Sequence, residues 1–297
     1  YYRETLGCKQ LTTAMNWKSA DKLTTDDAER YSYTACDVMA VNRYTGGIHV
    51  GQNNGYRIDP GHFLRSRSIT KNPLQLPTNL KQPAGHPFII TESAWVRPNR
   101  YQTEGPFMIA ASMSLTGVDS LCWFAQTRPT WMTDPRRTWW KIGESYALHK
   151  WTGSIPQQMG MFPANALLYR KGYLQAGDVV VHEERPLENI WARKPPIIAE
   201  TEAFDPNRDT KDLRDQAGAP TDVSRLAFLV GPVEVVFGGD PSRTRVADLS
   251  PFIDAAARTV RSNTGEIELN YGVGLFEVDA PKAQGVAGFL KDAGGRF

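Results

Sequence analysis

The chain has 297 residues, enough for about two domains of average size. Its 34 Lys and Arg residues nearly balance 32 Asp and Glu residues, and the charges are interspersed, so the basic patch of a nucleic-acid-binding protein is absent from the sequence. No apolar run approaches the roughly 20 residues that cross a bilayer. We therefore expect neither nucleic acid nor membrane among the partners, and a neutral or weakly charged substrate.

The opening stretch predicts a strand followed by a helix. Residues 10–17 are apolar and β-branched, and the strand that they predict delivers Asn16 and Trp17 at its carboxyl end. A helix is predicted over residues 26–34, because Asp26 can cap it with a glutamate three positions later, in the manner of a capping box.

Two further strands flank a long irregular segment. Residues 37–42 are nearly continuous in apolar side chains, as in a strand buried on both faces of a parallel sheet. Residues 45–73 are rich in Gly, Asn, Asp and Pro, so we expect a long functional loop without regular structure. The third strand, residues 87–91, ends in Glu92.

The alternation continues with a helix over residues 104–115, a strand over residues 118–124 and an amphipathic helix over residues 136–151. Strands and helices that alternate with short returns predict a parallel α/β fold. Every predicted strand ends in polar or aromatic side chains, which favours a (β/α)8 barrel, because barrel enzymes assemble their sites from several strand ends. We assign residues 1–155 to this TIM barrel region.

Beyond residue 155 the pattern becomes rich in short strands. They are predicted at residues 178–181, 226–237, 259–261, 266–271, 275–279 and 286–290. The turn signals between the last of them suit antiparallel hairpins. A polar stretch at about residues 200–221 is expected to be an exposed excursion. We expect residues 156–297 to form a β-sandwich-like accessory domain without chemistry of its own.

Glu92 is the candidate for carboxylate chemistry. A retaining glycosidase uses two carboxyl groups roughly 5 to 5.5 Å apart, one to attack the anomeric carbon and one to protonate the leaving oxygen. Glu92 follows an apolar strand that would hold its backbone rigidly, and polar and aromatic neighbours flank it. The structural alternative is a glutamate that caps the next helix or pairs with an arginine.

Three motifs resemble the large clan of retaining (β/α)8 glycoside hydrolases that contains cellulases, mannanases, β-galactosidases and β-agarases. Ile89-Ile90-Thr91-Glu92 matches the end of strand seven, Asp37-Val38-Met39-Ala40-Val41-Asn42-Arg43-Tyr44 matches strand six, and Trp123-Phe124 matches strand eight. The resemblance covers residues 10–124 as barrel strands five to eight. It implies that Glu92 is the catalytic nucleophile, that Tyr44 hydrogen-bonds to it, and that Trp123 lies under a sugar ring.

The acid/base of that clan has no counterpart in the matched segment. In the clan an Asn-Glu pair ends strand four, and no such pair precedes residue 10. Asp59 and Glu104 are better interpreted as a turn residue and a helix-starting residue. We therefore expect a fragment whose partner is the missing amino-terminal half of the barrel. Two alternatives stay open: a non-catalytic carbohydrate-binding or scaffolding protein, and another kind of barrel enzyme.

Sugar rings stack on aromatic side chains, and their hydroxyl groups need polar partners. The candidates for substrate binding are Asn16, Trp17, Asn42, Arg43, His49, His62, Trp95, Trp123 and Trp131. The histidines and the three cysteines lack metal-ligand spacing, and no phosphate-binding loop is present in the sequence, so we expect no metal and no cofactor. The resulting hypothesis is a retaining β-glycoside hydrolase acting on a polysaccharide or oligosaccharide, with endo action slightly favoured by the long loop.

Overall fold

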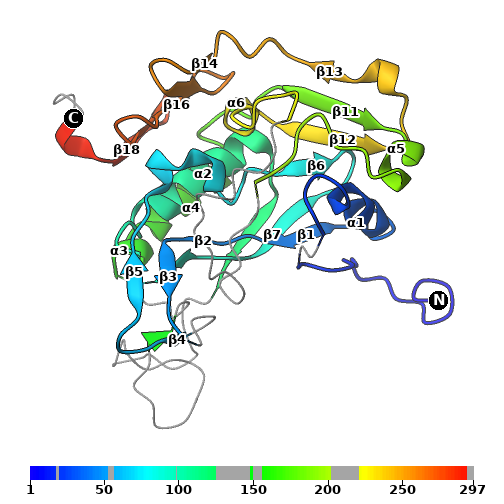
Figure 1. Cartoon of the computed structure of the whole chain (residues 1–297), viewed down its shortest axis with the longest axis horizontal. Coiled ribbons are helices and arrows are strands. Elements are labelled where there is room, and N and C mark those ends of the chain that lie inside the picture. Colours follow the sequence, from blue (N-terminus) through cyan, green and yellow to red (C-terminus); the bar gives the residue numbers. More distant parts are fainter. Residues whose placement is uncertain are drawn as a thin grey trace.

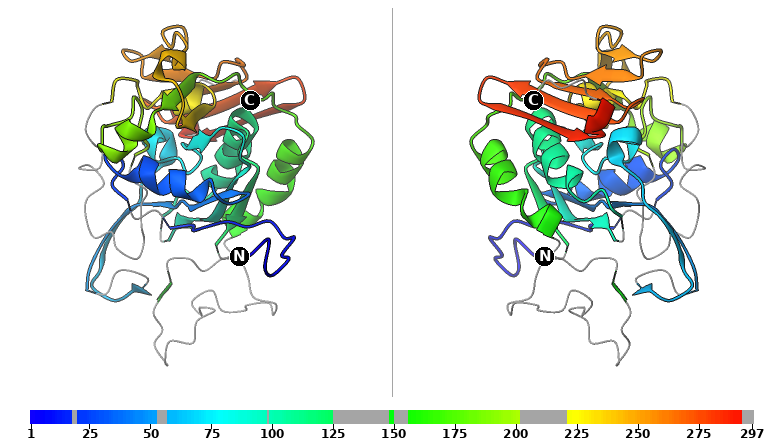
Figure 2. Two further views of the ribbon diagram at one scale, coloured as in Figure 1. Left: turned by 90° about the vertical axis from the view of Figure 1, so that its right-hand side faces the viewer. Right: turned by 90° about the vertical axis from the view of Figure 1, so that its left-hand side faces the viewer.

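The computed structural model describes residues 1–17, 20–52, 57–97, 99–124, 148–149, 156–201 and 221–292. A parallel sheet lies at its centre, with a mixed sheet and an antiparallel sheet above it in the view of Figure 1. Figure 2 shows the antiparallel sheet at the opposite end of the molecule from the amino-terminal segment. Within these ranges, no helix is long and apolar enough to cross a membrane.

The central sheet is parallel and has the order β1-β7-β9. Its strands are β1 (Met39–Asn42), β7 (Phe88–Ser93) and β9 (Ser120–Trp123). Met39 pairs with Phe88, and Ile89 pairs with Ser120. All four residues of β1 are buried, as expected for a central strand covered on both faces. The strands predicted from the three apolar runs of this region are confirmed.

The strand predicted over residues 10–17 is not formed, although the segment makes backbone contacts with β1. The Thr12 carbonyl accepts hydrogen bonds from the N–H groups of Asp37 and Val38 at 3.0 and 3.1 Å, and the Asn16 carbonyl accepts one from Asn42 at 2.6 Å. The Thr12 N–H donates to the Asp37 carboxylate at 2.7 Å instead of to a backbone acceptor. The segment therefore runs along the outer edge of β1 without forming a regular ladder.

The predicted first helix is confirmed as α1 (Asp26–Tyr33), but its start differs from the expected capping box. Thr25 occupies the N-cap position and Asp26 is the first helical residue. The Asp26 carboxylate lies 3.4 Å from Arg30 and 3.6 Å from Lys22. Asp26 therefore pairs with cations and still complements the positive end of the helix dipole.

The expectation of an irregular loop over residues 45–73 is wrong. The segment contains β2 (Thr45–Gly46), β3 (Ile48–Val50), β4 (Arg57–Ile58), β5 (Phe63–Arg65) and the 3₁₀ helices η1 (Ile69–Lys71) and η2 (Pro73–Gln75). β3 and β5 form an antiparallel hairpin that projects from the central sheet (Figure 1). A side chain on Gly47 would collide with the Arg65 carbonyl oxygen, so this glycine permits the close approach of the two strands. β2 pairs with β8 (Trp95–Val96), and β4 pairs with β10 (Leu148–His149).

A second sheet, of order β13-β11-β12-β6, joins the two halves of the chain. Its strands are β6 (Lys81–Pro83), β11 (Val181–Arg185), β12 (Val233–Phe237) and β13 (Arg245–Val246). β6, β11 and β12 are parallel to one another, which differs from the expected antiparallel sandwich. The strand predicted over residues 226–237 divides into α6 (Ala227–Val230) and β12 because Gly231 and Pro232 interrupt it.

The last part of the chain forms a five-stranded antiparallel meander. Its strands are β14 (Ile253–Asp254), β15 (Thr259–Arg261), β16 (Ile267–Asn270), β17 (Leu275–Ala280) and β18 (Ala283–Gly288). The strands predicted at residues 259–261, 266–271 and 275–279 are confirmed, and the one predicted at 286–290 begins earlier. The Asn270 side chain accepts hydrogen bonds from Gly272 and Val273 and so closes the β16–β17 turn.

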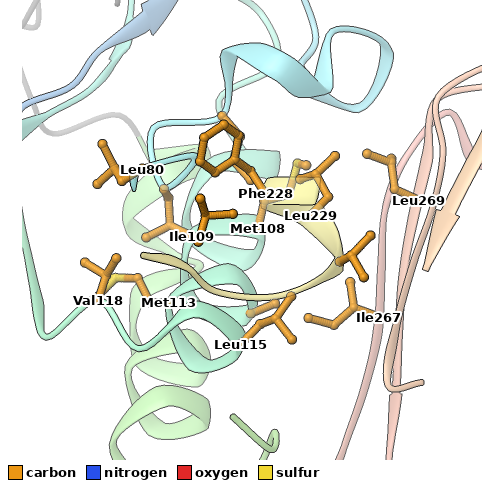
Figure 3. Packing of buried hydrophobic residues seen from close by; sticks show 14 of the residues in the cluster. Leu80, Met108, Ile109, Met113, Leu115, Val118, Phe228, Leu229, Ile267 and Leu269 are labelled. Atoms are coloured by element: carbon orange, nitrogen blue, oxygen red, sulfur yellow. The ribbon is translucent and has the colours of Figure 1, made fainter. Parts of the chain in front are cut away.

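The hydrophobic core is built around α2 (Glu104–Thr116), which confirms the helix predicted at residues 104–115. Figure 3 shows Met108, Ile109, Met113 and Leu115 of this helix beside residues of α6 and β16. Phe107 also packs edge-to-face on Phe276, with ring centroids 5.6 Å apart. The two sides of residue 155 therefore share one core. The described strands are compatible with strands six to eight of a barrel, and the complete barrel stays a prediction.

A buried network of ion pairs also joins the halves. Lys81 lies 2.7 Å from Asp27 and 3.4 Å from Glu183, and Arg185 lies 2.8 Å from Asp27. All four side chains are buried. The charges balance within the group, as a buried cluster requires. The remaining helical segments of the second half are α3 (Pro156–Met159), α4 (Phe162–Arg170), α5 (Leu187–Trp191), η4 (Pro241–Arg243) and η5 (Leu290–Asp292).

Candidate functional site

Glu92 lies at an irregular point of the central sheet. Val41 pairs with Ile90 and Asn42 pairs with Glu92, so Thr91 is an extra residue in β7. The alternation of buried and half-buried side chains along β7 breaks at the same place. In a regular strand Glu92 would share the buried face of Ile90. The bulge therefore turns Glu92 away from the core, as bulges do where a side chain must be re-aimed.

Tyr44 and Glu92 meet at the carboxyl ends of adjacent parallel strands. The Tyr44 phenol donates a hydrogen bond to Glu92 Oε2, and the Arg43 N–H donates to the Glu92 carbonyl at 2.9 Å. Tyr44 is buried, whereas Glu92 is half-buried. The contact that the resemblance implied between these two residues is present. Their catalytic roles stay a prediction.

Two more aromatic rings lie against Tyr44. Trp17 stacks on it with ring centroids 6.3 Å apart and planes inclined by 21°, and Phe124 meets it edge-on at 6.5 Å. The Phe124 N–H donates to the Ser93 carbonyl at 2.8 Å, which fixes Phe124 beside the end of β7. Trp17 and Phe124 are both half-buried. Glu92 therefore lies beside an aromatic group formed by Trp17, Tyr44 and Phe124.

Asn42 is held by the extra residue of the bulge. The Thr91 hydroxyl donates to Asn42 Oδ1 at 2.7 Å, and Asn42 is buried. Among the described residues, Asn42 Nδ2 has no hydrogen-bond partner. Buried amide donors are rarely left unpaired, so this N–H group marks a point of the site where a partner is expected, although its atom has almost no accessible surface in this structure. Asn16 is half-buried and bonds to Asn42 through the backbone only.

Arg43 and Trp95 were predicted to bind sugar, but both side chains are enclosed in the protein. Arg43 is only 2% exposed and pairs with Glu200 at 3.1 Å, because its side chain points to the opposite face from its neighbours in the strand. Trp95 is 1% exposed, and its indole N–H donates to Glu104 at 3.1 Å. Side chains this enclosed have no surface to offer to a sugar.

Trp123 is half-buried and packs between two rings, at 5.7 Å from Trp95 and 5.5 Å from Phe162. Trp123 therefore has less free ring surface for stacking on a sugar than the resemblance implied. Phe124, which was not among the predicted binding residues, lies beside Tyr44 instead. Adjacent residues of a strand point to opposite faces of the sheet. The sequence alone therefore did not determine whether Trp123 or Phe124 faces the site.

Glu104 starts α2, as predicted, and is a structural residue. Its buried carboxylate accepts hydrogen bonds from the Ser68 hydroxyl at 2.6 Å and the Ile69 N–H at 2.7 Å. Burial raises the pKa of Glu104, and these hydrogen bonds oppose that change. A side chain on Gly105 would stand 2.9 Å from the Trp95 ring, so this glycine lets the indole lie on the first turn of α2.

His49 and His62 come together on the β3–β5 hairpin. His49 Nε2 lies 2.8 Å from His62 Nδ1, and the Asp59 N–H donates to the same His62 atom at 3.2 Å. An atom that accepts from a backbone N–H carries no proton, so His49 Nε2 is assigned as the donor. His49 is buried, and His62 is half-buried. Trp131 lies outside the described residues.

The described ranges hold no group of three or more His, Cys, Asp and Glu side chains arranged to bind a metal ion. The three cysteines are free thiols. The chain matched no family model, no curated protein and no solved structure. The site is therefore interpreted from its own geometry.

Proposed function

We propose that the protein is a retaining β-glycoside hydrolase that acts on a polysaccharide, with Glu92 as the nucleophile. The observation that carries the proposal is the Tyr44 hydrogen bond to Glu92 at the ends of adjacent parallel strands. Sites of barrel enzymes are built at this end of their strands. A half-buried carboxylate that is held on one oxygen suits attack by the other oxygen on an anomeric carbon.

The surrounding side chains suit a sugar. The half-buried rings of Trp17 and Phe124, which lie against the buried Tyr44, offer apolar surface to the C–H groups of a pyranose. The buried Asn42 amide has an unpaired N–H donor, which we propose binds a sugar hydroxyl group after the side chains that cover it move aside. We propose that His62, which is half-buried on the projecting hairpin and contacts His49, also contacts the substrate.

A retaining enzyme needs a second carboxyl group to protonate the leaving oxygen. The proposal places this group on a strand beyond the outer edge of the segment 10–17. Leu11 is 77% exposed and Met15 is 49% exposed at that edge. Exposed apolar side chains grouped on one segment are typical of a surface that another element covers.

The second candidate is a carbohydrate-binding protein without hydrolase activity. It is favoured by the sequence of residues 1–124, which contains no Asn-Glu pair to serve as the general acid of the resembled clan. Such a protein would retain the aromatic group and Asn42 and would bind sugar chains intact.

The test is trapping of the glycosyl-enzyme intermediate. The protein is incubated with fluorinated glycosyl donors and a panel of β-linked polysaccharides, and peptides are then analysed by mass. We expect a covalent sugar on Glu92 and loss of hydrolysis in Glu92→Gln. Glu277→Gln is the matched control, because Glu277 is also a half-buried strand glutamate but lies on β17. Binding without hydrolysis or labelling would support the second candidate.

A further inference from the structure

A second aromatic surface lies at the end of the molecule where α1 and α5 meet (Figures 1 and 2). The Tyr31 ring lies edge-to-face with Trp191, at 5.8 Å between centroids, and edge-to-face with Phe237, at 5.9 Å. The three residues come from α1, α5 and β12, so the cluster forms only in the folded chain. We name these residues, with Arg193 and Lys194, the α5 patch.

Trp191 is the exposed member of the α5 patch. It is 60% exposed, whereas Tyr31 and Phe237 are half-buried beneath it. In an edge-to-face pair, one ring directs its edge at the face of the other, so at least one face of the indole is not covered by Tyr31. The patch thus presents a flat aromatic surface on a fixed support, which is the geometry that stacks on a sugar ring.

The loop after α5 gives the patch a positive charge. Residues 191–195 are all exposed, and Arg193 and Lys194 lie within three positions of the indole. Arg193 has a φ of 55°, in the left-handed region. Its N–H bonds to Ile190, and the Lys194 N–H bonds to Asn189, both at 3.0 Å, which is the Schellman arrangement at a helix end.

The position of Arg193 is one that glycine usually occupies, because a side chain is disfavoured there. An arginine at such a position adds nothing to the backbone. Residues in this strained conformation gather at binding sites, which is consistent with a guanidinium that serves a ligand.

The loop after α5 is anchored by the side chain of Arg185. The buried Arg185 side chain donates to the carbonyl groups of Pro195 at 2.9 Å and Lys194 at 2.8 Å, and it pairs with Asp27. A surface that is already ordered loses little conformational entropy when it binds. The patch is thus built as a rigid platform.

We propose that the α5 patch binds a polysaccharide that carries carboxylate or sulfate groups, with Trp191 stacking on a sugar ring and Arg193 and Lys194 pairing with the acid groups. The choice of a carbohydrate rests on the proposed function. Single-stranded nucleic acid also stacks on aromatic rings, but it needs a longer basic track. The exposed Glu188 lies one turn before Trp191 and can accept hydrogen bonds from sugar hydroxyl groups.

The test is calorimetric titration with polygalacturonate, a sulfated galactan, a neutral galactan and polyuridylate, all with the Glu92→Gln protein so that no chain is cleaved. We expect binding of an acidic polysaccharide that is weakened at least tenfold by Trp191→Ala. The double variant Arg193→Gly, Lys194→Gln should weaken it several-fold. Arg193→Gly should not lower the melting temperature, because glycine suits that backbone position.

Two controls match these variants. Tyr2→Ala removes an aromatic side chain of nearly equal exposure, 61%, and Arg258→Gly replaces the other arginine of the described residues that has a left-handed backbone. Both should leave binding unchanged. Equal binding by Trp191→Ala and wild type would overturn the proposal, as would preference for the neutral galactan or polyuridylate. Hydrolysis by the wild type separates the two proposals, because it reports on Glu92 and not on Trp191.

Discussion

Thr91 is the extra residue of the β7 bulge, and its hydroxyl donates a hydrogen bond to Asn42 on the neighbouring strand. One residue therefore changes the direction of Glu92 and also fixes the amide beside it. The bulge and the hydrogen bond lie at the same point of the sheet. We therefore expect the direction of the Glu92 side chain to depend on Thr91.

Thr91→Val keeps the shape of the side chain and removes the donor. Asn42 Oδ1 then loses its partner in a buried site, so we expect a loss of about 1–3 kcal/mol in the free energy of unfolding. Thr91→Ser retains the hydroxyl and should lose less than half of that amount. Urea unfolding followed by fluorescence measures both. Equal stability of Thr91→Val and wild type would show that the hydrogen bond does not hold the bulge.

Tyr44→Phe tests the contact on which the proposed function depends. Hydrogen bonds to charged groups contribute about 1.5–3 kcal/mol, so we expect kcat/KM to fall roughly tenfold to a hundredfold. The ring stays in place, so the packing of Trp17 and Phe124 and the melting temperature should change little. Steady-state kinetics on the substrate identified for the wild type give the result. An unchanged kcat/KM would remove Tyr44 from the mechanism.

Lys81→Met tests whether the buried ion pairs hold the two halves together. The substitution leaves Asp27 and Glu183 with one less buried cation, so we expect a loss of about 3–5 kcal/mol. The control is Arg261→Ala, which breaks an exposed pair with Glu268 at 2.7 Å and should cost at most about 1 kcal/mol. Denaturant unfolding compares the two. A similar small loss in both variants would contradict a structural role for the network.

The sequence was informative where side chains are apolar and buried on both faces. β1 is buried along its whole length, and the motif that ends the apolar part of β7 identified Glu92 and its partner Tyr44. β9 was predicted from its apolar residues, although its side chains are exposed or half-buried. The direction of each side chain was harder to predict. Arg43 lies between two residues of the site, and only the strand geometry shows that it points to Glu200.

Buried charge explains another error. The strand predicted at residues 178–181 lies instead at Val181–Arg185, where four of five residues are polar or charged. Hydrophobic periodicity does not detect a strand whose charged residues pair with one another in the interior. The β3–β5 hairpin was missed for a different reason, because its Gly-rich composition is typical of loops while its pairing is fixed by contact across the strands.

His182 gives the protein a pH-dependent contact between β11 and its neighbours. Its Nδ1 atom lies 2.5 Å from Glu234, and its Nε2 atom lies 3.1 Å from Glu184. Hydrogen bonds to Glu234 and Glu184 raise the pKa of His182 above 6.5, while burial and the nearby Arg245 oppose the change. Arg243 also pairs with Glu184, at 3.1 Å, and shares its charge.

Because the pKa is higher in the folded protein, the charged imidazole stabilises the fold fully below pH 6.5, and this contribution is lost as the pH rises through the folded-state pKa. We therefore expect wild type to exceed His182→Gln in stability at pH 6 and the difference to shrink steadily toward pH 9. Urea unfolding of both proteins across this range measures the difference. A gap that stays constant or widens with rising pH would mean that His182 is neutral in the folded protein.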